Sequence, residues 1–336
     1  MFRKIFTAAF SLCTVVCLCG CSLTERDIIE TQHKADIPPR MLFLGDSIAA
    51  GYGLDGYTSS DNYNCNSYSN ILKERYTAEF GDNIKHEMRN LAVSGDTSDD
   101  LLELIDSGKL DSELANSEAV VVSIGGNDML HIMFDLFKDL GIESKDSFDL
   151  DSIDLLGAAA SLITMDSEID EALNQYEINL QEISAKLNEK SDGTIYIQTL
   201  YNPLETFDNI SVVVEFSDEK IGRFNEIIKN NAGENYKVID VAADFEGKCN
   251  ELTRIGSMDI HPNEEGHKVI AECVDSAFRA TGFSYTTSEY GEPYLTLSSI
   301  LLILGGICAM LLVVMIIIPK MFKNTDQIDK KKKSEK

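Results

Sequence analysis

The sequence predicts a single α/β domain over residues 41–282, built on a parallel five-stranded sheet with helices on both faces. Two observations predict it. Short apolar runs alternate along the chain with segments whose apolar residues recur at helical spacing, and no internal repeat interrupts this alternation. Strands that alternate with helices form a parallel sheet, because each helix returns the chain to the same end of the sheet.

Each element follows from its local pattern. Apolar runs predict strands at 41–44, 119–124, 194–200 and 236–241, and 84–91 is a plausible further strand. Helical spacing predicts helices at 68–76 and 168–190, and further helices that begin after the capping residues Thr97, Ser217 and Asn263. Segment 135–165 breaks the alternation, and we interpret it as an insertion that is either a lid over a site or an extra surface helix.

The amino-terminal end has the features of an export signal. Arg3 and Lys4 precede an apolar run, which predicts a signal peptide at 1–21. The run ends in Leu18-Cys19-Gly20-Cys21, which resembles a bacterial lipobox with Cys21 as the lipidated residue. A plain signal peptide and an uncleaved anchor are the alternatives. The polar segment 22–40 is expected to be a linker.

The carboxyl-terminal end has the features of a membrane anchor. Residues 295–318 contain no charged side chain and are long enough to cross a bilayer, which needs about 20 helical residues. Segment 283–294 is expected to be a juxtamembrane linker. The tail at 319–336 is rich in lysine and is therefore expected in the cytoplasm, with the domain outside the cell.

Composition excludes some functions. The 336 residues include 56 acidic and 29 basic side chains, a formal charge of −27, and this balance argues against a nucleic-acid partner. The sequence has no HExxH motif and no paired CxxC motif, so we expect neither a metal nor another cofactor. Cys65, Cys249 and Cys273 are the cysteines of the exported segment, and their odd number leaves at least one unpaired within the chain.

Polar residues follow the predicted strands where a ligand site is expected, at the carboxyl ends. They are found in Gly45-Asp46-Ser47, in the segment around Gly95, in Gly125-Gly126-Asn127-Asp128 and in Asp259-Ile260-His261-Pro262. A hydroxyl with a nearby imidazole can act as an activated nucleophile, and glycine N–H groups and an amide can bind an oxyanion. Taken singly, Ser47 is also a common helix cap, and Gly95 and Asn127 are common turn residues.

These four segments in this order resemble the four sequence blocks of the SGNH (GDSL) hydrolases, and Tyr201-Asn202-Pro203 resembles a further feature of bacterial members. The resemblance implies a flavodoxin-like three-layer α/β/α sandwich. It implies that Ser47 is the nucleophile and that His261 is the base. It also implies an oxyanion hole made by the N–H groups of Ser47 and Gly95 and by the amide of Asn127.

One position departs from the family pattern. The acid that orients the histidine usually lies three residues before it, where this sequence has Met258. Asp259 lies two residues before His261 and is our candidate for this role. The alternatives are a backbone carbonyl as the orienting group, or a site that has lost activity.

The resemblance implies an esterase, and the predicted export signal and membrane anchor place it outside the cell, tethered to the membrane. We expect it to act on a lipid ester, such as a lysophospholipid. An O-acetyl esterase acting on a glycan is an alternative within the same fold. A catalytically inactive surface binding module is the alternative from another class, and Met258 is the feature that favours it.

Overall fold

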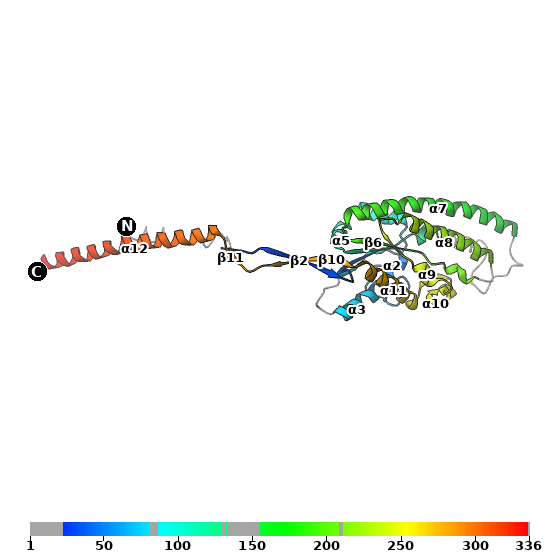
Figure 1. Cartoon of the computed structure of the whole chain (residues 1–336), viewed down its shortest axis with the longest axis horizontal. Coiled ribbons are helices and arrows are strands. Elements are labelled where there is room, and N and C mark those ends of the chain that lie inside the picture. Colours follow the sequence, from blue (N-terminus) through cyan, green and yellow to red (C-terminus); the bar gives the residue numbers. More distant parts are fainter. Residues whose placement is uncertain (1–22, 81–86, 130–131, 133–154, 208–210, 335–336) are drawn as a thin grey trace. The chain divides into compact units, whose positions relative to one another are not determined.

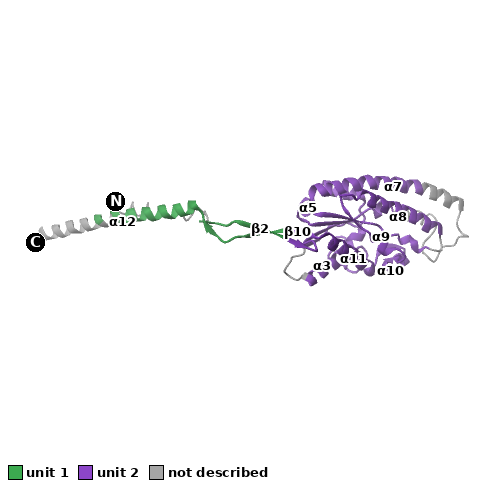
Figure 2. Cartoon of the chain, in the orientation of Figure 1, with its two compact units in different colours: residues 1–32, 286–336 green, residues 33–285 purple. Residues whose placement is uncertain are grey.

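The computed structural model describes residues 23–80, 87–129, 132, 155–207 and 211–334. These residues form two compact units, one at 33–285 and one that joins the residues up to 32 to those from 286 onward (Figure 2). The predicted signal peptide at 1–21 lies outside the described residues, as does most of the predicted insertion at 135–165.

The unit at 33–285 is built on the predicted parallel sheet of five strands. In chain order the strands are β3 (Arg40–Gly45), β4 (Glu87–Asn90), β5 (Ala119–Ser123), β6 (Thr194–Gln198) and β7 (Lys237–Ile239). They lie in the order β4-β3-β5-β6-β7, and all neighbours are parallel. The chain therefore leaves β3 toward one edge of the sheet and returns to its other side at β5. Ligands bind at such a reversal in open α/β sheets.

Helices cover both faces of the sheet, so the predicted three-layer α/β/α fold is confirmed (Figure 1). One layer contains α4 (Ser98–Asp106), α5 (Asp111–Asn116), α7 (Leu155–Lys190) and α8 (Ser211–Asn231). The other contains α3 (Tyr68–Phe80), α9 (Val241–Phe245), α10 (Cys249–Leu252) and α11 (Glu264–Thr281). The short helix α2 (Ser47–Ala50) follows β3 directly.

Two of the three predicted helix caps are confirmed. Thr97 and Asp100 form a reciprocal capping box at the start of α4, and the Asn263 side chain accepts a hydrogen bond from the N–H of Gly266 at the start of α11. The predicted cap at Ser217 is wrong. Helix α8 already begins at Ser211, and the Ser217 hydroxyl lies inside it, where it donates to the Val214 carbonyl oxygen at 3.1 Å.

The core lies on both faces of the central strands. The side chains of β5 from Val120 to Val122 are fully buried, as are those of Leu42–Leu44 in β3. A buried lysine joins the neighbouring helices α7 and α8, because Lys220 Nζ lies 2.5 Å from a carboxylate oxygen of Asp166 and 2.8 Å from one of Asp170. An ammonium group this deeply buried needs such partners.

The other unit contains paired strands and a long helix. Strand β1 (Thr24–Glu25) pairs antiparallel with β11 (Tyr294–Leu295), and the Tyr294 hydroxyl donates to Asp27. Strands β2 (Ile28–Ala35) and β10 (Phe283–Tyr290) also pair, and they begin in one unit and end in the other. The segments that we expected to be linkers thus contain strands. The domain boundaries themselves stay predictions.

Helix α12 (Leu297–Ser334) contains the one stretch among the described residues that is apolar and long enough to cross a membrane, Leu297–Ile316. Most of its large apolar side chains are exposed, including Leu301, Met310 and Met315. This stretch overlaps the span predicted at 295–318.

The buried sheet gives a test of the fold. We expect Ile197→Ala to lower the free energy of unfolding by about 2–5 kcal/mol, because it leaves a cavity beside the central strand β5. Ile178→Ala on α7 is the matched control and should change this free energy little, because 52% of the Ile178 side chain is already exposed. Urea unfolding of the detergent-solubilised chain, followed by near-UV circular dichroism of the tyrosines, measures both. Equal effects would contradict this assignment of the core.

Candidate active site

Ser47 lies at the tight turn between β3 and α2. Gly45 has a φ of +135°, and a Cβ at this position would overlap the Ser123 carbonyl oxygen of β5, so only glycine fits. Asp46 follows, and its carboxylate accepts the Ile48 N–H at 3.0 Å and caps α2. Ser47 is the first helical residue, and it is 8% exposed.

His261 lies in β9 (Asp259–Pro262), and its ring contacts both Ser47 and Asp259. The distance from His261 Nε2 to Ser47 Oγ is 2.9 Å. The distance from His261 Nδ1 to Asp259 Oδ1 is 2.5 Å, and the His261 N–H donates to the same oxygen at 3.0 Å. A hydroxyl, an imidazole and a carboxylate thus form one chain of hydrogen bonds, which is the arrangement that activates a serine nucleophile.

The loop before β9 explains how an acid only two residues away can reach the histidine ring. Strand β8 (Thr253–Arg254) pairs with β9 through an irregular register, and the short helix η4 (Ile255–Ser257) connects them. Met258 ends η4 with a φ of +55°, the one positive φ of a non-glycine residue in the described part of the chain. After this left-handed turn, the Asp259 carboxylate lies within hydrogen-bond distance of His261 Nδ1. The Tyr201 hydroxyl donates to the Ile260 carbonyl oxygen at 2.8 Å and supports this loop.

The surroundings favour a neutral imidazole and an ionised acid. Burial lowers the pKa of His261; the carboxylate of Asp259 opposes this, and the charge of Arg254 adds to it. Burial raises the pKa of Asp259, but the hydrogen bonds from His261 and the nearby Arg254 outweigh burial and hold that pKa below its ordinary value. A neutral imidazole at neutral pH can accept a proton from the hydroxyl.

The candidates for an oxyanion hole follow β4 and β5, with Gly95 in a turn and Asn127 in a helical turn that begins at Gly126. Gly95 is exposed, with a φ of +99°, and a Cβ there would contact nothing within 4 Å. The Asn127 Nδ2 group donates to the Asp96 carbonyl oxygen at 2.8 Å, which joins the two loops. Because β4 and β5 flank β3, both loops lie at the same edge of the sheet as Ser47. Their roles stay predictions.

Two carboxyl groups support these loops. Asp128 accepts the Ser98 N–H at 2.9 Å and also contacts the Ser98 hydroxyl, so it anchors the loop to the start of α4. Asp46 is 2% exposed, and burial, reinforced by the charges of Asp128 and Asp96, raises the pKa of Asp46 to about 7. Both side chains face protein groups, as expected for residues that stabilise the loops.

The sequence did not indicate two further residues at the site. The ring of Tyr52 lies 4.6 Å from the ring of His261, measured between centroids. The Arg254 guanidinium forms a 2.8 Å ion pair with Asp259 Oδ2. Tyr52 lies between Gly51 and Gly53, a pattern of exposed loops that gives no sign of a histidine neighbour. Arg254 belongs to no recognisable motif.

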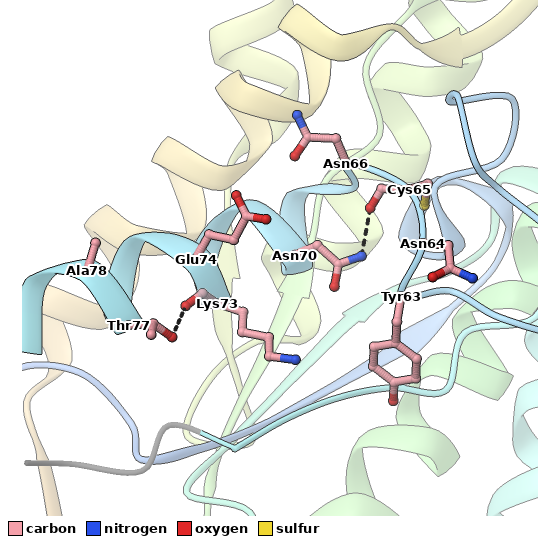
Figure 3. Close-up of a pocket in the computed structure, with 9 residues that line it drawn as sticks. All are labelled: Tyr63, Asn64, Cys65, Asn66, Asn70, Lys73, Glu74, Thr77 and Ala78. Carbon is pink, nitrogen blue, oxygen red and sulfur yellow. Dashed lines mark hydrogen bonds between the residues drawn. The ribbon is translucent and has the colours of Figure 1, made fainter. Parts of the chain in front are cut away.

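A separate pocket of about 690 Å³ lies along α3 and the loop before it (Figure 3). The Lys73 side chain extends toward Tyr63, and its Nζ lies 5.9 Å from the centre of that ring. The Asn70 amide donates to the Cys65 carbonyl oxygen at 2.8 Å. Residues lining the pocket are Tyr63, Asn64, Cys65, Asn66, Asn70, Lys73, Glu74, Thr77 and Ala78. None of them belongs to the Ser47–His261–Asp259 chain.

Comparisons with known proteins agree with this description. The model of the GDSL-like lipase/acylhydrolase family matches residues 43–269. The uncharacterized protein YpmR of Bacillus subtilis (strain 168) is 24% identical over 298 residues, which are 84% of this chain and 98% of YpmR.

Solved structures are similar in fold. The lipase Lip_vut3 from a goat rumen metagenome has a TM-score of 0.51 at 18% identity, covering 71% of this chain and 96% of its own. Axe2, an acetylxylan esterase from Geobacillus stearothermophilus, has a TM-score of 0.46 at 18% identity, covering 71% and 93%. At 18% identity, the similarity to Lip_vut3 shows the fold alone.

The contact between His261 and Asp259 gives a test that needs no substrate. We expect Asp259→Asn to lower the pKa of His261 further, because the carboxylate stabilises the charged imidazolium. An NMR titration of the histidine ring protons measures this pKa. Asp192→Asn, an exposed change just before β6 at the opposite end of the sheet, should leave it unchanged. An unchanged or raised pKa in Asp259→Asn would exclude a charge contact in solution.

Proposed function

The chain belongs to the GDSL-like lipase/acylhydrolase family, and from this premise we propose that it hydrolyses carboxylic esters through an acyl-enzyme on Ser47. One observation carries the proposal: Ser47 Oγ, His261 and Asp259 form a continuous chain of hydrogen bonds of 2.9 and 2.5 Å. A weak nucleophile needs a base at this distance, and the base needs a third group that fixes its tautomer.

In the first half-reaction, Ser47 Oγ attacks the carbonyl carbon of the ester while His261 Nε2 takes the hydroxyl proton. The carbonyl oxygen becomes an oxyanion, which the N–H groups of Ser47 and Gly95 and the Asn127 amide would bind. Asp259 stabilises the imidazolium. The tetrahedral intermediate then collapses, the bond to the alcohol breaks, and the alcohol leaves with the proton from His261.

In the second half-reaction, His261 takes a proton from a water molecule, and the resulting hydroxide attacks the acyl carbon. The second tetrahedral intermediate releases the carboxylic acid, and the proton on His261 returns to Ser47 Oγ. The donation from Asn127 to the Asp96 carbonyl oxygen holds the amide in one orientation through both steps. Such preorganised donors are worth about 10²–10³ in rate each.

The domain would lie outside the cell, tethered by α12. The apolar stretch Leu297–Ile316 supports an anchor, and the lysines after it support a cytoplasmic carboxyl terminus. The signal peptide at 1–21 would direct export, and lipidation of Cys21 would add a second attachment.

A tether favours substrates at the membrane surface, so a lipid ester such as a lysophospholipid is our first candidate. An O-acetyl group on a glycan is the second candidate, because the same serine, histidine and acid can cleave an acetyl ester. An inactive binding module is least favoured, because Ser47, His261 and Asp259 keep the geometry that catalysis requires.

The proposed nucleophile gives the most direct test. We expect Ser47→Ala to abolish hydrolysis of p-nitrophenyl esters, because the variant lacks the hydroxyl group that His261 deprotonates. The circular dichroism spectrum should stay unchanged. The detergent-solubilised full chain is assayed with acetate, butyrate and octanoate esters. A preference for octanoate supports the lipid ester, and a preference for acetate supports the O-acetyl esterase.

Ser112→Ala, an exposed change on α5, is the matched control and should keep full activity. Activity that survives in Ser47→Ala would exclude Ser47 as the nucleophile. A folded wild-type chain that hydrolyses none of the three esters would favour the inactive binding module.

The proposed orientation has its own test. With an epitope tag placed after Lys336, we expect the tag to resist protease added to intact cells, because a cytoplasmic tail is shielded by the membrane. The domain should be digested or released under the same conditions. Permeabilised cells are the control, in which the tag must become sensitive. Digestion of the tag in intact cells would reverse the orientation.

A further inference from the structure

Arg254 contacts two parts of the candidate active site at once. Its Nη2 atom lies 2.8 Å from Asp259 Oδ2 and donates to the Tyr52 carbonyl oxygen at 3.1 Å, and its Nη1 atom donates to the Gly53 carbonyl oxygen. One guanidinium group thus joins the acid of β9 to the loop that follows α2. The planar fork of arginine can hold several acceptors in fixed directions, which a lysine ammonium cannot do.

The loop held by Arg254 contacts both other members of the chain of hydrogen bonds. The Tyr52 N–H donates to the Ser47 carbonyl oxygen at 2.9 Å, and the Tyr52 ring lies against the ring of His261. Gly53 has a φ of +80°, and a Cβ at this position would overlap the guanidinium group. The absence of a side chain at residue 53 therefore makes room for Arg254.

The carboxylate of Asp259 is divided between two partners. Oδ1 accepts from the ring and the backbone of His261, and Oδ2 faces Arg254. Rotation of the carboxylate about its bond to Cβ would break both contacts together. Asp259 is 31% exposed, so without Arg254 water would compete for Oδ2 and the carboxylate would have more freedom to turn.

We propose that Arg254 is a positioning residue, which holds the Asp259 carboxylate and the Tyr52–Gly53 loop against His261. Its guanidinium group contacts Asp259, Tyr52 and Gly53. This role also accounts for the unusual position of the acid: a carboxylate two residues before the histidine, on a loop with a left-handed turn, is held from its far side by a cation. The effect of Arg254 on kcat rests on the proposed function.

The test combines a spectroscopic signal with kinetics on the full chain in detergent. The proton on His261 Nδ1, hydrogen-bonded to a carboxylate, gives a strongly deshielded ¹H NMR resonance that needs no substrate. We expect Arg254→Gln to broaden or remove this resonance and to lower kcat on the order of 10–100-fold, because misplaced groups lose rate steeply. Arg254→Lys should fall between Arg254→Gln and wild type.

Arg75→Gln on α3 is the matched control, because Arg75 is similarly exposed and also pairs with carboxylates, Glu272 and Asp275. It should change neither the resonance nor kcat. Gly53→Ala provides a second route, because it displaces the guanidinium group without removing it, and it should reproduce the effect of Arg254→Gln. Circular dichroism identifies any variant that fails to fold.

Several outcomes would overturn the proposal. One is a folded Arg254→Gln variant that keeps both the resonance and kcat. Another is full recovery in Arg254→Lys, which would mean that charge alone suffices. A wild-type chain that shows the resonance, loses it in Arg254→Gln and hydrolyses no ester would support the positioning role while it contradicts the proposed function, so the two failures are distinguishable.

Discussion

The close approach of β3 and β5 at the end of β3 is the constraint on which the site depends. The Asp46 N–H donates to the Ser123 carbonyl oxygen at 3.0 Å, and Gly45 leaves no side chain between the two strands. The chain then turns directly into α2, so the backbone itself fixes the place of Ser47. The order of the strands adds the second condition, because the loops after β4 and β5 diverge on either side of this turn.

The polar groups around this turn are divided by charge. Asp46, Asp96 and Asp128 follow β3, β4 and β5, and burial, reinforced by the charges of Asp128 and Asp96, raises the pKa of Asp46. Arg254 lies on the side of β9, beside Asp259 and His261. The positive charge of Arg254 faces Asp259 Oδ2, whereas His261 faces Oδ1. It lowers the pKa of both Asp259 and His261, which favours an ionised acid and a neutral imidazole. This separation lets buried acids coexist with a base that stays neutral.

The sequence predicted the elements that local chemistry determines. Strands β3, β5 and β6 could be predicted because they are apolar and end at glycine or polar residues. The caps at Thr97 and Asn263 could be predicted because their side chains act within one turn. The cap predicted at Ser217 was wrong because a serine inside a helix and a serine at its start look alike in sequence. The strands within 22–40 and 283–294 were missed because their residues are largely exposed and polar. These segments become strands only by pairing with a partner that is distant in the sequence. Tyr52 and Arg254 were missed for the same reason, because the contact between residues some 200 positions apart leaves no local signal.

The pairing of β1 with β11 has a consequence for the order in which the chain folds. The Tyr294 hydroxyl bonds to Asp27, a residue 267 positions earlier, so this contact closes only after nearly all of the chain has been made. At about 5–20 residues per second, the amino-terminal strand remains without its partner on the order of tens of seconds. An unpaired strand is exposed to wrong partners throughout that time. Strand β1 spans only two residues and includes the charged Glu25, and so short and charged a segment is a poor template for aggregation during synthesis.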